Sequence, residues 1–250
     1  MAKYAKSGVV LWQGPSEIDG SWIVLIATGL GKASANSKTG DLVQTWILRA
    51  DITPQEAIKT GADISVCGDC PHRGTTCYVK AWQAPRSIWE CFMRGRYATP
   101  DLDAGADILR GRKVRLGAYG DPAAVPYWVW VILLAGVLEG TGYTHQWQNC
   151  DPRFSAWLMA SADSALQGEH ARALGYRTFR VGSFADSLIR KVEFLCPASA
   201  EAGRKLNCAA CLACGGTSLS ANKASVFIPA HGSKGIVKAI DARARAALPV

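Results

Sequence analysis

The sequence contains no hydrophobic run long enough to cross a bilayer. Its most apolar stretch, residues 125–138, has about fourteen residues and is interrupted by Pro126, whereas a membrane-spanning helix needs about twenty. The first twenty residues also lack the sustained apolar core of a secretory signal. We therefore expect a soluble protein of the cytoplasm.

Runs of like charge, internal repeats and low-complexity tracts are absent as well. No more than two basic residues are adjacent, although 28 Lys and Arg against 20 Asp and Glu give a formal net charge of +8. A dispersed positive excess suits a polyanionic partner, which points to nucleic acid or a nucleotide substrate. The same excess also occurs as an ordinary solvated surface. The basic residues nearest the cysteines are Arg73, Lys80, Arg86, Arg94, Arg96, Arg204 and Lys205.

A phosphate-binding loop is excluded near residue 30. The segment Gly29-Leu30-Gly31-Lys32 has Ile26 where the motif needs its first glycine. Ala33 stands where the motif needs Ser or Thr. The glycines of this segment therefore predict a turn and no nucleotide site.

The pattern of apolar residues predicts an α/β fold. Three short apolar segments within residues 1–50 predict an N-terminal β extension, and residues 51–97 read as a loop-rich region that carries cysteines. Further strands are expected at residues 113–118, 143–147, 156–161, 177–181, 192–196 and 225–228, with helices at 126–139, 164–174 and 234–247. This alternation favours a partial or distorted (β/α) barrel over residues 51–250, integrated with the extension into one globular domain.

Four of the nine cysteines form a C-terminal cluster with the spacing Cys196-x11-Cys208-x2-Cys211-x2-Cys214. In a reducing compartment, closely spaced cysteines favour metal ligation over disulfides. Four thiolates can hold a 4Fe-4S cube or a tetrahedral Zn²⁺. Two consecutive Cys-x2-Cys steps favour iron-sulfur, and zinc is the alternative. The interpretation that needs no metal is a set of buried free thiols.

A second group, Cys67-x2-Cys70-x6-Cys77, comes earlier in the chain. Three thiolates leave one coordination position of a metal open, as sites that bind a cofactor or substrate do. His72 or Cys91 could instead supply a fourth ligand and make the site a structural one. Both readings stay open at this point.

Polar residues follow several of the expected strands. Asp121, His145 and Asp163 are candidates for acid-base catalysis, because the carboxyl ends of strands carry the sites of α/β folds. Each also has a structural explanation. Asp121 precedes Pro122 and suits a turn, Asp163 suits a helix start, and a histidine is commonly satisfied by a backbone carbonyl.

Several motifs together resemble a family of uncharacterised phage- and plasmid-borne cysteine-rich proteins. They are NSKTG (36–40), CGDCPHRGTTCYV (67–79), RLGAYGDPAAVP (115–126), GYTHQW (142–147), GYRTFRV (175–181) and CPAS with its trailing Cys-x2-Cys-x2-Cys. The resemblance covers most of the chain and implies no particular activity. It places the protein in the cytoplasm of a host cell if a phage encodes it.

A more distant resemblance is to radical S-adenosylmethionine enzymes, which hold a 4Fe-4S cluster through three thiolates. It implies Cys67, Cys70 and Cys77 as cluster ligands, S-adenosylmethionine as a cofactor, and an auxiliary cluster on the four C-terminal cysteines. The spacing departs from the usual Cys-x3-Cys-x2-Cys of that family. We expect an iron-sulfur enzyme that acts on nucleic acid or nucleotides, and the alternative is a non-catalytic zinc protein that binds nucleic acid.

Overall fold

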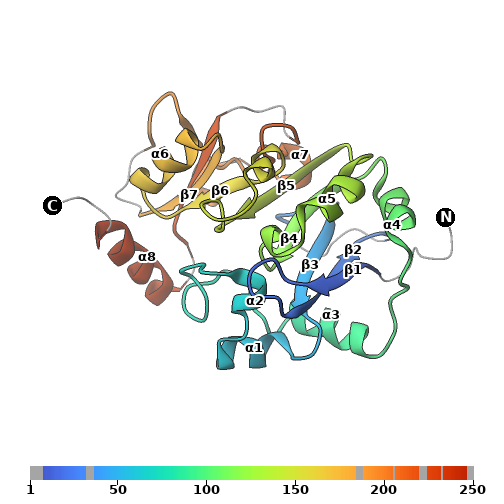
Figure 1. Ribbon diagram of the computed structural model, residues 1–250. Coiled ribbons are helices and arrows are strands. Elements are labelled where there is room, and N and C mark those ends of the chain that lie inside the picture. Colours follow the sequence, from blue (N-terminus) through green and yellow to red (C-terminus); the bar gives the residue numbers. More distant parts are fainter. Residues whose placement is uncertain are drawn as a thin grey trace.

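The computed structural model describes residues 8–31, 37–183, 188–204, 206–219, 224–231 and 233–246. Asn36, Lys205 and Ala247, which belong to segments discussed above, lie outside these ranges. Within the described ranges, nine strands form one sheet in the order β1-β2-β3-β4-β5-β6-β7-β9-β8 (Figure 1). The protein is thus a mixed α/β protein with a mostly parallel sheet.

The first three strands form an antiparallel meander at one edge of this sheet. They are β1 (Val9–Pro15), β2 (Trp22–Thr28) and β3 (Val43–Arg49). All three were predicted from their Val, Ile, Leu and Trp content, which suits buried strands. β3 then pairs in parallel with β4, so the expected N-terminal extension continues directly into the rest of the sheet.

The remaining strands pair in parallel with their neighbours. They are β4 (Lys113–Tyr119), β5 (Glu139–Thr144), β6 (Met159–Ala162), β7 (Thr178–Gly182), β8 (Glu193–Leu195) and β9 (Ser225–Pro229). From β4 to β7 the spatial order follows the chain order, and only β9 inserts between β7 and β8. The carboxyl ends of these strands therefore meet along one edge of the sheet.

The helices correct several expectations from the sequence. The region 51–97, expected to be loop-rich, contains α1 (Pro54–Thr60), α2 (Ile64–Cys67) and α3 (Ala84–Met93). Other helices are α4 (Leu102–Leu109), α5 (Tyr127–Leu134), α6 (Ala165–Ala173), α7 (Cys208–Cys211) and α8 (Lys234–Ala246), with 3-10 turns η1 (Pro122–Ala124), η2 (Pro152–Ala156) and η3 (Ala200–Ala202). α5 ends before residue 139 because β5 begins there.

The strand predicted at residues 143–147 was misplaced, since β5 ends at Thr144. Its first half is rich in glycine, which is a poor strand former. The fold requires these glycines because a Cβ at Gly142 would lie 2.6 Å from Leu158 and 2.9 Å from Leu116. β5 is therefore specified by close packing against its neighbours.

The two faces of the sheet are covered differently. On β6, Ala160 packs with Ala171 of α6, whereas its neighbour Met159 packs with Ala213 and Cys214 of the C-terminal cysteine loop. Because successive side chains of a strand point to opposite faces, α6 and this loop lie on opposite sides. Within the described ranges, no helix is long and apolar enough to cross a membrane.

Candidate functional site

The four C-terminal cysteines are close enough for three of them to affect the pKa of Cys214. Cys196 follows β8, Cys208 and Cys211 lie on α7, and Cys214 lies in the turn after α7. Burial raises the pKa of Cys214 to about 12, and the negative charges of the other three thiolates add to this effect, while the Tyr143 hydroxyl opposes it. Cys196 and Cys211 also pack against the hydrophobic cluster that contains Cys214, so these cysteines are neighbours in the fold.

Local hydrogen bonds shape the loop that carries three of these cysteines. The Asn207 side chain caps α7 by accepting from the Ala210 N–H at 2.9 Å, and the Cys208 N–H donates to the Lys38 carbonyl at 2.8 Å. Leu212 adopts a left-handed conformation with φ of 49°, which ends the helix after one turn. The chain then turns back so that Cys214 joins the other cysteines.

Arg177, the residue before β7, holds the same loop in place through hydrogen bonds. Its buried guanidinium donates to the carbonyls of Gly215 at 2.5 Å and Ala213 at 2.8 Å, and to that of Ala224 at 2.5 Å. Burial lowers the pKa of Arg177, yet five donors on a rigid plane are well suited to several carbonyls at once. Sequence reasoning gave this residue no role.

The first three cysteines form a separate group at the other cysteine loop. Cys67 ends α2, and Cys70 and Cys77 follow in the loop after it. Burial raises the pKa of Cys70 to about 12, and it raises the pKa of Cys67 well above its usual value, with the charges of Cys70 and Cys77 as further causes. The three thiols therefore also lie near one another.

This first loop is attached to the carboxyl end of β5. Gln146 donates through Nε2 to the Cys67 carbonyl at 3.3 Å and to Asp69 Oδ1 at 2.8 Å. Gly68 has φ of 58° and ψ of −139°, a conformation open essentially to glycine alone. A Cβ at this position would also collide with the Gln146 side chain.

The two candidates for a fourth ligand of the first group have other side-chain contacts. His72 Nδ1 lies 2.6 Å from Thr76 Oγ1 and its Nε2 lies 2.9 Å from Asp163 Oδ1, so both ring nitrogens face other partners. Cys91 lies on α3, and its thiol interacts with the Tyr97 hydroxyl. The structural four-ligand reading of this group is therefore not supported by the arrangement of these two residues.

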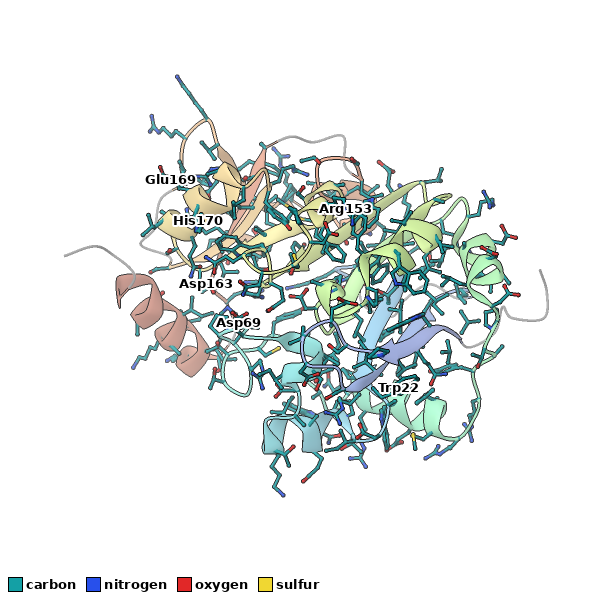
Figure 2. The ribbon with its side chains drawn as sticks, in the orientation of Figure 1. Trp22, Asp69, Arg153, Asp163, Glu169 and His170 are labelled. Carbon is teal, nitrogen blue, oxygen red and sulfur yellow. The ribbon has the colours of Figure 1, made fainter. Side chains whose placement is uncertain are left out.

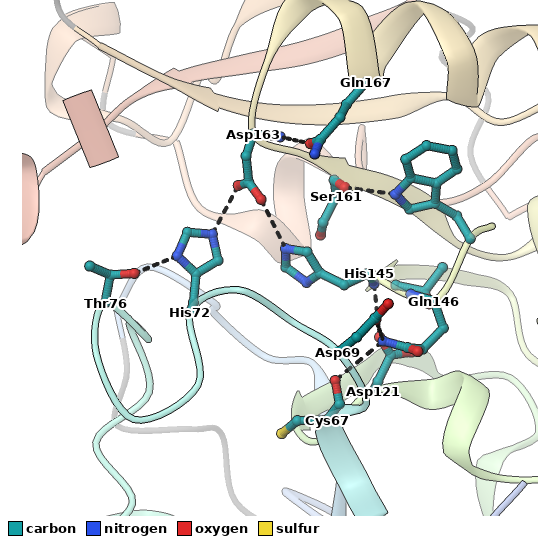
Figure 3. Close-up of polar contacts among 12 residues, drawn as sticks. Cys67, Asp69, His72, Thr76, Asp121, His145, Gln146, Ser161, Asp163 and Gln167 are labelled. Carbon is teal, nitrogen blue, oxygen red and sulfur yellow. Dashed lines mark hydrogen bonds and ion pairs between the residues drawn. The ribbon is translucent and has the colours of Figure 1, made fainter. Parts of the chain in front are cut away.

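Of the three strand-end candidates, the structure brings two together. His145 Nε2 lies 3.9 Å from Asp163 Oδ2, and His72 completes the cluster from the first cysteine loop (Figure 3). Burial lowers the pKa of His145 to about 4, although the Asp163 carboxylate opposes this shift. His72, considered from the sequence only as a cysteine partner, belongs instead to this cluster.

Asp121 lies behind the cluster and supports it. Its carboxylate accepts from the Ala123 N–H at 3.0 Å and from the His145 backbone N–H at 2.8 Å. Burial raises the pKa of Asp121 to about 6, whereas these N–H donors lower it. Its contacts agree with the turn-forming role that its place before Pro122 suggests. They also make it a positioning residue for the backbone of His145.

Two hollows adjoin the cysteine loops. One of about 780 Å³ is bordered by Gly68, Asp69 and Gln146 of the first loop region and by Tyr127 and Arg153 on the opposite side. The second, of about 380 Å³, is lined by the following residues: Gln44, Trp46, Tyr78, Val79, Lys80, Gln83, Ala84, Pro85, Arg115 and Ala118.

The smaller hollow is lined by residues that lie close to each cysteine group. Tyr78, Val79 and Lys80 directly follow Cys77, while Arg115 is close enough to Cys208 to lower its pKa against the raising effect of burial. A molecule in this hollow would therefore lie near both groups and beside two cationic side chains.

Comparisons with known proteins identify no relative. A scan against protein-family models, a search of curated proteins and a search of solved structures each return no match to this chain.

Proposed function

We propose that this protein is an iron-sulfur enzyme of the phage- and plasmid-borne type, with a 4Fe-4S cluster on Cys196, Cys208, Cys211 and Cys214. The proposal depends on one observation about the packing of these cysteines. Cys214 lies in a hydrophobic cluster against which Cys196 and Cys211 pack, and the charges of Cys196, Cys208 and Cys211 add to the effect of burial in raising the pKa of Cys214. Four neighbouring thiolates can hold a 4Fe-4S cube, and the two consecutive Cys-x2-Cys steps favour it over zinc.

The same reasoning applies to Cys67, Cys70 and Cys77, to which we assign a second iron-sulfur cluster. With His72 and Cys91 engaged elsewhere, three thiolates would leave one iron open to a further ligand. By resemblance to radical enzymes, S-adenosylmethionine is the cofactor that we propose for that position. A bound cluster of this kind supplies one electron at a time.

The chain's own residues favour a substrate in the smaller hollow. The smaller hollow offers Lys80 and Arg115 to a phosphate and the exposed Tyr78 ring to a base. We therefore propose a nucleic acid or nucleotide substrate. We also retain the partial (β/α) barrel, which the parallel pairing and sequential order of β4 to β7 support.

Metal content after purification without oxygen tests the proposal. We expect brown protein that absorbs broadly near roughly 400 nm and holds about eight irons, four for each cube. Cys211→Ser and Cys70→Ser should each remove about half of the iron. Cys150→Ser is the matched control, because Cys150 interacts with the Tyr176 hydroxyl and belongs to neither group.

Colourless protein that carries zinc would overturn the proposal. It would support the alternative, a non-catalytic zinc protein that binds nucleic acid. Iron content that is equal in Cys211→Ser, Cys70→Ser and the parent protein would refute the assignment of ligands.

A further inference from the structure

Outside the cysteine groups, two imidazoles and one carboxylate converge at the carboxyl edge of the sheet. His145 follows β5, Asp163 follows β6 and His72 comes from the first cysteine loop. One ligand atom from each residue lies within 4.8 Å of the other two. Figure 2 labels Asp163 and, on that loop, Asp69, and both carboxylates oppose the effect of burial on the pKa of His145.

Each of the three residues is held in place by a second contact. Thr76 Oγ1 lies 2.6 Å from His72 Nδ1, which fixes the ring so that Nε2 faces Asp163. The Asp163 backbone N–H donates to Gln167 Oε1 at 2.8 Å, and the His145 backbone N–H donates to Asp121 at 2.8 Å. The contact of His72 with Thr76 is typical of metal-binding histidines, which usually have a hydrogen-bond partner on the ring nitrogen that does not bind the metal.

His145 provides the observation that points to a ligand. Its Nε2 is shielded from solvent and makes no hydrogen bond, and its nearest acidic neighbour, Asp163 Oδ2, is 3.9 Å away. A buried polar atom without a partner is costly and unusual in proteins. The pair His72 and Asp163 could form a proton relay without His145, but that arrangement would leave the Nε2 atom unexplained.

We propose that His72, His145 and Asp163 bind one divalent transition metal ion. Two imidazole nitrogens and one carboxylate oxygen suit Fe²⁺, Mn²⁺, Co²⁺ or Zn²⁺. Three protein ligands leave positions open for water or for an oxygen or nitrogen donor of a substrate. The site uses no cysteine, so it goes beyond the iron-sulfur proposal and does not depend on it.

Titration of the full-length protein with Mn²⁺ tests this site, because Mn²⁺ favours oxygen and nitrogen ligands over thiolates. The electron paramagnetic resonance signal of free Mn²⁺ should show one bound equivalent. Asp163→Asn and His145→Gln should each weaken binding at least tenfold, and Thr76→Val should weaken it by about tenfold through the loss of orientation of His72. Equilibrium dialysis with Co²⁺ repeats the test with a metal that binds nitrogen more tightly.

Two controls separate this site from other effects. His170→Gln removes an exposed histidine outside the cluster and should bind Mn²⁺ as the parent protein does. Asp163→Asn can still accept a hydrogen bond from His72, so we expect an unchanged circular dichroism spectrum and melting temperature.

The metal site and the iron-sulfur clusters can fail independently. Asp163→Asn should keep its iron, and Cys211→Ser should keep its Mn²⁺ site. Binding of Mn²⁺ and Co²⁺ that is equal in Asp163→Asn and the parent protein, or undetectable in the parent protein, would overturn the inference.

Discussion

At the scale of single residues, Arg177 shows how one buried cation organises a site it does not enter. Its guanidinium donates to carbonyls of the C-terminal cysteine loop and to Ala224 just before β9. Hydrogen bonds from a charged donor contribute roughly 1.5–3 kcal/mol each. Together with the Gly142 N–H, which donates to the Cys214 carbonyl at 2.9 Å, this residue holds the loop that carries Cys214.

Arg177→Met keeps an unbranched apolar side chain and removes every one of these donors. We expect the free energy of unfolding in urea to fall by about 3 kcal/mol or more, because several buried carbonyls lose their partners. The iron that we propose on the C-terminal cysteines should fall as well. Arg153→Met is the control, since Arg153 is exposed and its ion pair is with Asp151, and we expect a change within about 1 kcal/mol. A stable, iron-replete Arg177→Met variant would contradict this role.

Residue types and spacing indicated part of the site. The two cysteine groups could be found from the sequence because their members are close along the chain. The cluster of His72, His145 and Asp163 could not be assembled in this way, since His72 and Asp163 are 91 residues apart. Their meeting depends on the adjacency of β5 and β6 and on the path of the first cysteine loop. His145 and Asp163 were found separately, as polar residues after strands.

At the scale of elements, the first cysteine loop depends on Gly68. Gly68→Ala should displace Gln146 from the Cys67 carbonyl and force a backbone conformation that alanine rarely adopts. We expect loss of the iron that we propose on Cys67, Cys70 and Cys77, measured as iron content after anaerobic purification, while the iron proposed on the C-terminal cysteines is kept.

Gly61→Ala is the matched control for this loop. Gly61 also ends a helix at positive φ, 80°, but an added Cβ there would meet no atom within 4 Å. It should cost about 1 kcal/mol of stability and leave the iron content unchanged. Equal loss of iron in both variants would show that backbone strain alone, without the contact to Gln146, disturbs the loop.

The elements themselves were predicted unevenly, for physical reasons. Strands of the N-terminal meander are rich in β-branched and aromatic residues and were found. α1 was missed although Thr53 caps it, Pro54 opens it and Gly61 closes it, because the cysteines nearby suggested a loop. β5 was misplaced because its glycines are required by close neighbours that are distant in sequence.

At the scale of the whole molecule, the basic residues that give the net charge of +8 differ in what they contact. Several basic residues near the first cysteines are occupied: Arg73 pairs with Asp63, and Arg86 and Arg94 pair with Glu90. Lys80 lies in the smaller hollow, between the exposed rings of Tyr78 and Trp82 in the sequence. An alternation of aromatic and basic side chains is typical of surfaces that bind single-stranded nucleic acid.

Tyr78→Ala tests this surface against the rest of the charged molecule. Tyr78 lines the hollow and is 61% exposed, and the loss of one stacked base should weaken binding of a fluorescent single-stranded oligonucleotide by about 1–3 kcal/mol, measured by anisotropy. Lys80→Ala should instead reduce the dependence of binding on salt by about one charge. Trp22→Ala removes a ring that is 55% exposed on β2, outside the hollow, and should leave affinity unchanged. Equal weakening by Tyr78→Ala and Trp22→Ala would mean that the oligonucleotide follows general surface charge and that this hollow has no particular part in binding it.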